Sequence, residues 1–226
     1  MQASGQAKTS KLMLWAGLFY LAIIGLGIGA EGVLRGAIFQ GADPAIWAEA
    51  LARAPGAFRL SLLFDLWMIF CDLAVGVLLY LLFRPRSEGL AMTILLLRVL
   101  QGALIGAALM PYLGLAEALG QGRAPSPDMV AQAHAIHGIG YDAALFFFGM
   151  SLLSLAPLVK KAGAPAVLAY GIGLSAVVYL TGTTLRLMAP ALHGGVVYAY
   201  VICLVAELAL AGWLIWRGST RRGLAL

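Results

Sequence analysis

Residues 60–83 decide the fold, because they read LSLLFDLWMIFCDLAVGVLLYLLF without a proline. A helix needs roughly 20 mostly apolar residues to cross the hydrocarbon core of a bilayer. This stretch is long enough, and its only charged side chains are Asp65 and Asp72. It therefore predicts a membrane-spanning helix that carries two carboxylates.

Five further stretches have the same apolar character. With residues 60–83 included, the expected spans are 12–34, 60–83, 90–115, 129–158, 164–188 and 196–216. Hydrophobic residues make up 62% of the 226 residues and charged residues only 11%, whereas soluble domains are about half apolar and about a quarter charged. Because so much apolar surface has to face lipid, we expect an all-α bundle of six transmembrane helices over residues 12–217.

Lysine and arginine gather in alternate connections between these spans. The basic connections and tails contain Lys8, Lys11, Arg84, Arg86, Lys160, Lys161, Arg217, Arg221 and Arg222. By the positive-inside rule they face the cytoplasm, which predicts a bacterial inner-membrane protein with cytoplasmic tails at 1–11 and 218–226. The net charge of +5 comes from these scattered groups, so we expect no nucleic-acid partner. On the other side of the membrane, segment 40–57 is expected to be a short interfacial helix or a loop.

Charged and ionisable side chains interrupt the predicted spans. They are Glu31, Arg35, Asp65, Asp72, Arg98, His134, His137, Asp142, Arg186 and Glu207. Each charged group inside a membrane helix costs about 2.5–3.5 kcal/mol, so these side chains are expected to face the bundle interior and to pair with one another.

The spacing of these residues predicts specific neighbours. Glu31 and Arg35 are four residues apart and can pair on one helix face. Asp72 and Arg98 lie at similar depth on antiparallel neighbouring helices, with Gln101 one turn beyond Arg98. The predicted arrangement is a polar funnel that opens outward and ends near the midplane at Asp72, Arg98 and Asp142.

Histidines raise the alternative of a metal or haem site. His134, His137 and Asp65 form a chemically reasonable set of metal ligands. A haem between His134 and His137 is excluded, because the two lie one turn apart on one helix, although His193 offers a ligand for the opposite face.

Small residues and aromatic residues suggest how the helices pack. Gly25/Gly29, Gly32/Gly36 and Gly102/Gly106 are small-xxx-small pairs, which favour close helix packing within the bundle or in a homo-oligomer. Tyr20 and Tyr112 lie near predicted membrane interfaces, where an aromatic belt is expected.

Several motifs contain most of these polar residues. They are Ala30-Glu31 with Val33 and Arg35, Gly41-Ala42-Asp43-Pro44, Phe58-Arg59-Leu60 leading through Asp65 to Phe70-Cys71-Asp72, Arg98-Val99-Leu100-Gln101, and His137-Gly138-Ile139-Gly140-Tyr141-Asp142 followed by Phe148-Gly149. Over roughly residues 12–217 the chain resembles a family of bacterial multi-pass membrane proteins catalogued as a domain of unknown function. The resemblance implies a characteristic polar set of Arg35, Arg59, Asp65, Asp72, Arg98, His137, Tyr141 and Asp142. It implies no activity and no cofactor.

Two classes of function remain open from the sequence. The first is binding of a small molecule or ion in the polar cavity, by a sensor, a transport component or an accessory subunit. Its expected ligand-binding residues are Glu31, Arg35, Arg59, Asp65, Asp72, Arg98, Gln101, His137, Tyr141 and Asp142. The second class is an intramembrane enzyme that depends on a metal or haem. Buried ion pairs that only fix helix register are the structural alternative to both.

The charge pattern yields a topology prediction. Reporter fusions at Lys160 and after Arg222 are expected to report cytoplasm, and a fusion near Arg123 is expected to report the outside, because lysine and arginine remain on the cytoplasmic side. A periplasmic carboxyl terminus would show that the spans are miscounted.

Overall fold

The computed structural model describes residues 2–220, with side chains from residue 6 onward, and within that range its regular structure is entirely helical. In chain order the helices are α1 (Gln2–Gly27), the π-helix η1 (Ile28–Arg35), α2 (Gly36–Ile38), α3 (Pro44–Arg53), α4 (Pro55–Phe83), α5 (Glu88–Gly120), α6 (Pro127–Lys161), α7 (Ala166–Met188), α8 (Pro190–Val197) and α9 (Tyr200–Ser219). The all-α fold expected from the sequence is confirmed.

Six helical stretches are long and apolar enough to cross a membrane. They are the continuous run through α1, η1 and α2 (Gln6–Ile38), and α4, α5, α6, α7 and α9. The chain is therefore a multi-pass membrane protein with six spans, as predicted. The sixth span begins at Tyr200 rather than at residue 196, because Pro190 starts the separate short helix α8 before it.

The segment between the first two spans contains a helix. The side chain of Asp43 caps α3 by accepting a hydrogen bond of 2.9 Å from the Ala45 N–H, and Pro44 occupies the first helical position. The Trp47 Nε1–H donates to the Gln40 carbonyl oxygen at 3.0 Å and ties α3 to the preceding loop. Of the two alternatives left open for this segment, the helix is the correct one.

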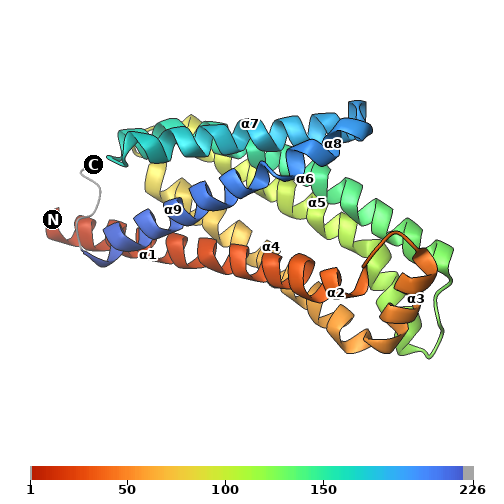
Figure 1. Cartoon of the computed structure of the whole chain (residues 1–226). Coiled ribbons are helices and arrows are strands. Elements are labelled where there is room, and N and C mark those ends of the chain that lie inside the picture. The colour runs from red at the N-terminus through yellow and green to blue at the C-terminus, as the bar shows by residue number, and fades with distance from the viewer. Residues whose placement is uncertain (1, 221–226) are drawn as a thin grey trace.

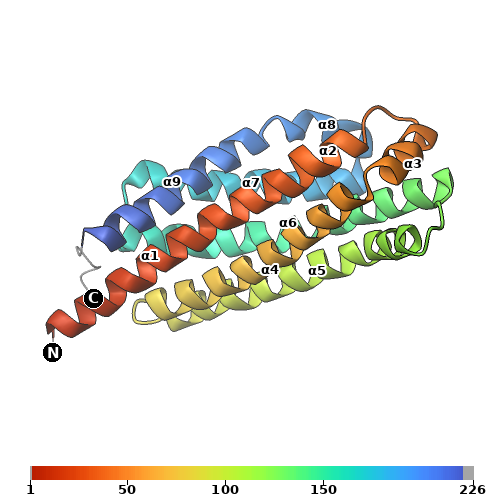
Figure 2. The same cartoon turned by 90° about the horizontal axis from the view of Figure 1, so that it is seen from below.

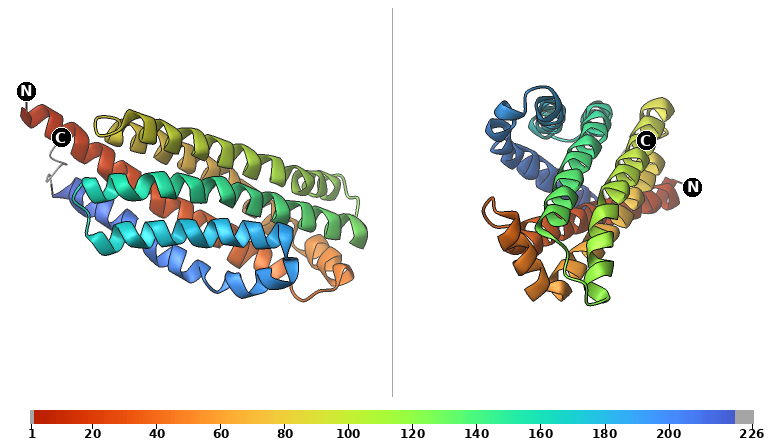
Figure 3. Two further views of the ribbon diagram at one scale, coloured as in Figure 1. Left: turned by 90° about the horizontal axis from the view of Figure 1, so that it is seen from above. Right: turned by 90° about the vertical axis from the view of Figure 1, so that its right-hand side faces the viewer.

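The six spans form a closed ring. Along it α1 contacts α4, α4 contacts α5, α5 contacts α6, α6 contacts α7, α7 contacts α9, and α9 returns to α1. Consecutive spans run in opposite directions, so that the start of α1 and the end of α9 lie at the same end of the bundle (Figures 1 and 2). The connections from α4 to α5 and from α6 to α7 lie there too (Figure 3).

We call this end the basic end and the opposite one the α3 end. The described basic residues that define the basic end are Lys8, Lys11, Arg84, Arg86, Lys160, Lys161 and Arg217. Arg221 and Arg222, which the sequence also assigned to this side, lie outside the described residues. The even number of spans agrees with the prediction that both tails share one side of the membrane.

Glycines allow the first and last spans to cross closely near the basic end. A Cβ on Gly218 would lie 2.5 Å from the Leu14 nitrogen, and one on Gly17 would lie 2.8 Å from the Ala211 carbonyl oxygen. Backbone atoms cannot yield as a flexible side chain can, so only glycine fits at this crossing. The sequence analysis had predicted close helix packing at other glycines, the pairs Gly25/Gly29, Gly32/Gly36 and Gly102/Gly106. Of those, Gly102 packs against Ile69, whereas Gly25 and Gly106 face open space.

The crossing generates a stability prediction. Gly218→Ala is expected to lower the free energy of unfolding by about 1–3 kcal/mol, because the new methyl group overlaps the α1 backbone. Gly212→Ala on the same helix is the matched control, since nothing lies within 4 Å of the added Cβ, and it is expected to be neutral or slightly stabilising. Thermal unfolding in detergent measures both, and equal midpoints for the two variants would contradict the close crossing.

Candidate functional site

The structure divides the predicted funnel into two separate groups of polar residues. Glu31, Arg35, Asp65 and His137 form a cluster toward the α3 end, which we call the outer cluster. Asp72, Arg98, Gln101 and Tyr141 instead line a cavity enclosed by the ring. Arg59 and Asp142, the other two expected site residues, belong to neither group.

Arg35 is the centre of the outer cluster. Its side chain is only 1% exposed, and its Nη1 donates to Asp65 Oδ2 at 2.5 Å and to Ser61 Oγ at 3.1 Å. Its Nη2 donates to Glu31 Oε1 at 2.6 Å, which confirms the expected pairing across one turn. His137 Nε2 lies 2.7 Å from the same Glu31 oxygen. The outer cluster is therefore an ion-pair network in which the two terminal nitrogens of Arg35 are paired, whereas its Nε has no hydrogen-bond partner among the described residues.

A π-helical turn positions Glu31 and Arg35. Within η1, the Gly36 N–H donates to the Glu31 carbonyl oxygen five residues back, in place of the usual four. The wider turn leaves Arg35 buried against α4, while the Glu31 side chain stays 41% exposed. π-Helical turns are rare and occur frequently at functional sites.

The residues of the predicted metal set are each bound to other partners. His134 Nδ1 lies 2.7 Å from the Tyr112 hydroxyl, His137 contacts Glu31, and Asp65 accepts from Arg35. Across residues 2–220, no three His, Cys, Asp or Glu side chains come together as a metal site. This geometry lends the metal hypothesis no support.

Asp142 lies away from the predicted floor of the funnel. Its carboxylate is 3.5 Å from Arg186 Nε and 3.9 Å from His193 Nε2, on the side of α7 and α8. Successive residues of an α-helix differ by about 100° in direction, so Asp142 points away from the cavity that its neighbour Tyr141 lines. Arg59 also serves a local purpose, because its Nη2 donates to the Ala116 carbonyl oxygen at 3.1 Å and joins α4 to α5.

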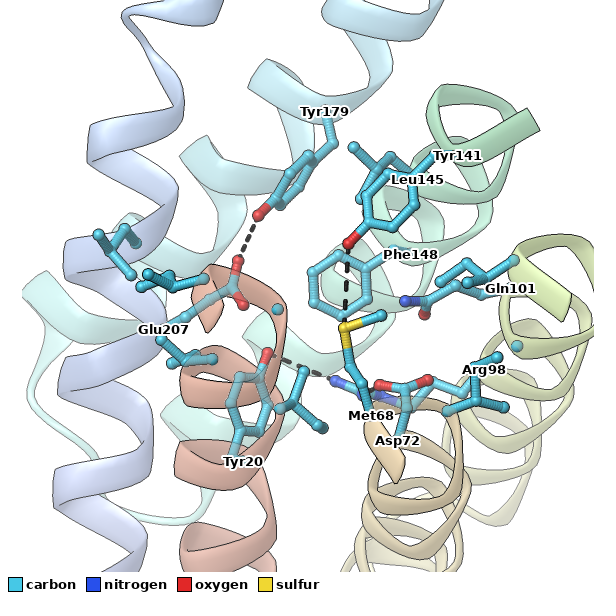
Figure 4. A pocket seen from close by; sticks show the side chains of 18 of the residues that line it. Tyr20, Met68, Asp72, Arg98, Gln101, Tyr141, Leu145, Phe148, Tyr179 and Glu207 are labelled. Atoms are coloured by element: carbon cyan, nitrogen blue, oxygen red, sulfur yellow. Dashed lines mark hydrogen bonds and ion pairs between the residues drawn. The ribbon is translucent and has the colours of Figure 1, made fainter. Parts of the chain in front are cut away.

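The cavity has a volume of about 210 Å³ and is lined by residues of all six spans. Figure 4 shows Asp72, Arg98 and Gln101, from α4 and α5, across the cavity from Glu207 of α9 and Tyr179 of α7. Phe148 and Tyr141 of α6 and Tyr20 of α1 add aromatic rings to the walls, beside Met68 and Leu145. The cavity therefore has polar groups on opposite walls and aromatic rings between them.

Asp72 and Arg98 form the buried ion pair of the first wall. Arg98 Nη1 donates to Asp72 Oδ1, and the exposed fractions of the two side chains are 0% for Arg98 and 4% for Asp72. The guanidinium of Arg98 also lies over two rings, 5.2 Å from the Tyr20 centroid and 5.0 Å from that of Phe148. The pair predicted from helix depth is thus present, supported by two cation–π contacts.

Glu207 dominates the opposite wall and was not among the expected site residues. The Tyr179 hydroxyl donates to Glu207 Oε1 at 2.7 Å, and Glu207 is buried. The sequence feature that could have identified Glu207 as a site residue is its charged carboxylate within a predicted span. Tyr20 was assigned to an aromatic belt, but it is fully buried beside Arg98, as Tyr112 is beside His134. Aromatic residues with a polar end suit both settings, so composition alone does not separate them.

Several polar atoms of the cavity residues have no hydrogen-bond partner among the residues that the structure describes. They are Asp72 Oδ2, Arg98 Nε, Gln101 Oε1 and the Tyr200 hydroxyl. A buried polar atom without a partner costs about 1–3 kcal/mol, and native proteins seldom leave one unexplained. Such atoms beside a cavity indicate a place where something else supplies hydrogen bonds.

Comparison with known proteins gives one match. A family model described as Domain of unknown function (DUF4386) matches residues 15–218, which covers all six spans. No curated protein and no solved structure matches the chain.

The buried pair generates a double-mutant prediction. Asp72→Asn and Arg98→Gln are each expected to lower the free energy of unfolding by about 3–5 kcal/mol, because each leaves an unmatched charge in the bundle. The double mutant should cost less than the sum of the two. Unfolding in detergent measures the cycle, with the exposed pair Glu49 and Arg53 as the control, for which coupling below about 1 kcal/mol is expected. Strictly additive effects at positions 72 and 98 would contradict the pairing.

Proposed function

The chain belongs to the DUF4386 family of unknown function, and we propose that it is a membrane-embedded binding protein that holds a small molecule inside its six-helix ring. The observation that carries this proposal is the cavity with unpartnered polar atoms on its walls. Lipid tails cannot satisfy polar groups, so polar atoms left unpaired at this depth are costly unless a ligand or water meets them. Binding sites are typically mostly apolar cavities with a few convergent polar groups, and this cavity fits that description.

The outer cluster contributes structure rather than a binding surface in this proposal. Arg35, Asp65, Glu31 and His137 use their polar groups on one another, and none of them lines the cavity. An ion-paired network fixes the register of η1, α4 and α6, since a slip of any one helix would leave a charge without its partner. The binding role is therefore assigned to the inner group alone.

We propose that a ligand reaches the cavity from the side, between the first span and α9. These helices cross closely at Gly17 and separate toward the α3 end (Figure 1). Ile28 of η1 and Leu204 of α9 both line the cavity, and Ile28 is 50% exposed. The exposed side chain of Ile28 supports this sideways route, and the outward-opening funnel expected from the sequence stays a prediction.

The cellular placement is part of the proposal. The gathering of lysine and arginine at the basic end supports a cytoplasmic location of that end and residence in a bacterial inner membrane. The sensor, transport and accessory roles each require a bound ligand, and all three are compatible with the cavity. Homo-oligomerisation through exposed glycines such as Gly25 and Gly106 stays a prediction.

The binding proposal is tested by filling the cavity. In a thermal-stability screen of the full chain in lipid nanodiscs against small molecules of varied charge, some compounds are expected to raise the unfolding midpoint. Leu204→Trp should abolish these shifts, because the larger ring occupies the cavity. Leu208→Trp, one turn along the same helix and facing lipid, is the matched control and should retain them. Stabilisation that survives Leu204→Trp would place binding elsewhere and overturn the proposal.

A further inference from the structure

The cavity contains more negative than positive ionisable groups. Among its lining residues, the ionisable acids are the carboxyl groups of Asp72 and Glu207, and the cation is the guanidinium of Arg98. Arg98 is committed to Asp72, whereas Glu207 receives a hydrogen bond from Tyr179 and forms no ion pair within the described part of the chain. An ionised carboxylate without a counter-charge is strongly disfavoured at membrane depth. A monovalent cation in the cavity would balance it.

The unpartnered oxygens call for hydrogen-bond donors. Asp72 Oδ2 and Gln101 Oε1 can only accept, and the Tyr200 hydroxyl can accept as well as donate. A ligand bearing N–H groups would satisfy the two acceptors on one wall. A carboxylate or phosphate ligand could accept from Arg98 Nε, the unpartnered donor of this wall, but it would approach two carboxyl groups and leave both acceptors unpaired.

Aromatic rings surround the same space. The tyrosine and phenylalanine residues that line it are Tyr20, Tyr141, Phe148, Tyr179 and Tyr200. Because Arg98 already lies over Tyr20 and Phe148, the rings left for a ligand are those of Tyr141, Tyr179 and Tyr200. The faces of such rings attract organic cations, and groups of aromatic residues are a known means of recognising them. A hydrated inorganic cation is a poorer match, because hard cations need several oxygen ligands and this lining is mostly rings and aliphatic side chains.

We propose, resting on the binding function above, that the ligand is a small protonated amine with an apolar body. Asp72 Oδ2 and Gln101 Oε1 are themselves fully buried, so these side chains turn toward the cavity to accept hydrogen bonds from the ammonium group. Glu207 on the facing wall supplies the balancing charge. The apolar body lies toward Ile24, Ile28 and Leu204, along the sideways route between the first span and α9. An amine suits this route, because its neutral form partitions into lipid and takes a proton from the Glu207 carboxyl group inside the cavity, which leaves an ammonium group opposite a carboxylate.

The test compares three probes of nearly equal size on the full chain in nanodiscs: phenethylamine, 2-phenylethanol and phenylacetate. Phenethylamine is expected to bind roughly tenfold or more tightly than the alcohol, because hydrogen bonds to a charged group are worth about 1.5–3 kcal/mol. Phenylacetate should bind most weakly. Calorimetry or a thermal-shift titration gives the three dissociation constants.

Substitutions in the cavity then assign the preference to its residues. Glu207→Gln is expected to reduce the amine-over-alcohol ratio by roughly tenfold, and Gln101→Leu, which removes an acceptor without changing charge, should reduce it as well. Glu49→Gln, an exposed acid on α3, is the matched control and should leave the ratio unchanged. The unfolding midpoint of each variant, measured without probe, establishes whether the variant is folded. If Glu207→Gln does not fold, the amine-over-alcohol ratio of Gln101→Leu tests the inference.

Each outcome bears on one of the two proposals. Equal affinities for amine and alcohol, both lost in Leu204→Trp, would overturn the amine inference and leave the binding cavity in place. A preference for phenethylamine that persists in Leu204→Trp would place amine binding outside the cavity and overturn the inference. If phenethylamine produces no binding at all, the amine inference is also overturned, and the wider compound screen alone judges the binding function.

Discussion

The pairing of Asp72 with Arg98 is the interaction on which the interior of the ring depends. Lipid cannot solvate either charge, so each has to find its partner inside the protein. The pair joins α4 to α5 at the wall of the cavity, and the Arg98 guanidinium extends the connection to Tyr20 of α1 and Phe148 of α6. One buried cation therefore sets the relative position of four helices. Arg35 has the same role nearer the α3 end, where it joins α1 to α4 through Asp65.

The contrast between these two layers explains why one is a candidate binding site and the other is not. Around Arg35, the acceptors Asp65, Glu31 and Ser61 close a compact network. Around Arg98, Asp72 keeps one oxygen unpartnered within the described chain. The difference comes from shape: η1 packs against α4 in the outer layer, while the six spans leave a cavity between them in the inner one. Polarity alone does not make a site, and the unused capacity for hydrogen bonding beside a cavity is what singles out the inner layer.

Sequence reasoning predicted the features that depend on local physical rules, and it failed for features that depend on helix rotation or on long-range contacts. The span count and the pairing of Asp72 with Arg98 depend on hydropathy and helix rise, which act along one chain segment and its direct neighbour. Asp142 was misplaced because the facing of a residue depends on helix rotation, which no span length determines. Glu207 was left out of the site because its importance arises from α9 closing the ring beside α1, a contact between the two ends of the chain. Long-range contacts of this kind leave no local signal.

The crossing of the first and last spans also has a consequence for biogenesis. Ribosomes deliver helices to the membrane in order, so Gly17 enters the bilayer long before its partner surface around Ala211 and Gly218 has been synthesised. Until α9 is inserted, the five earlier spans form an open arc whose Asp72, Arg98 and Tyr179 side chains border lipid on the missing side. Assembly of the interior is therefore postponed until α9 has been inserted. A nascent chain that stalls before Tyr200 would expose buried charge to lipid, and membrane quality control has a chemical feature there by which to recognise it.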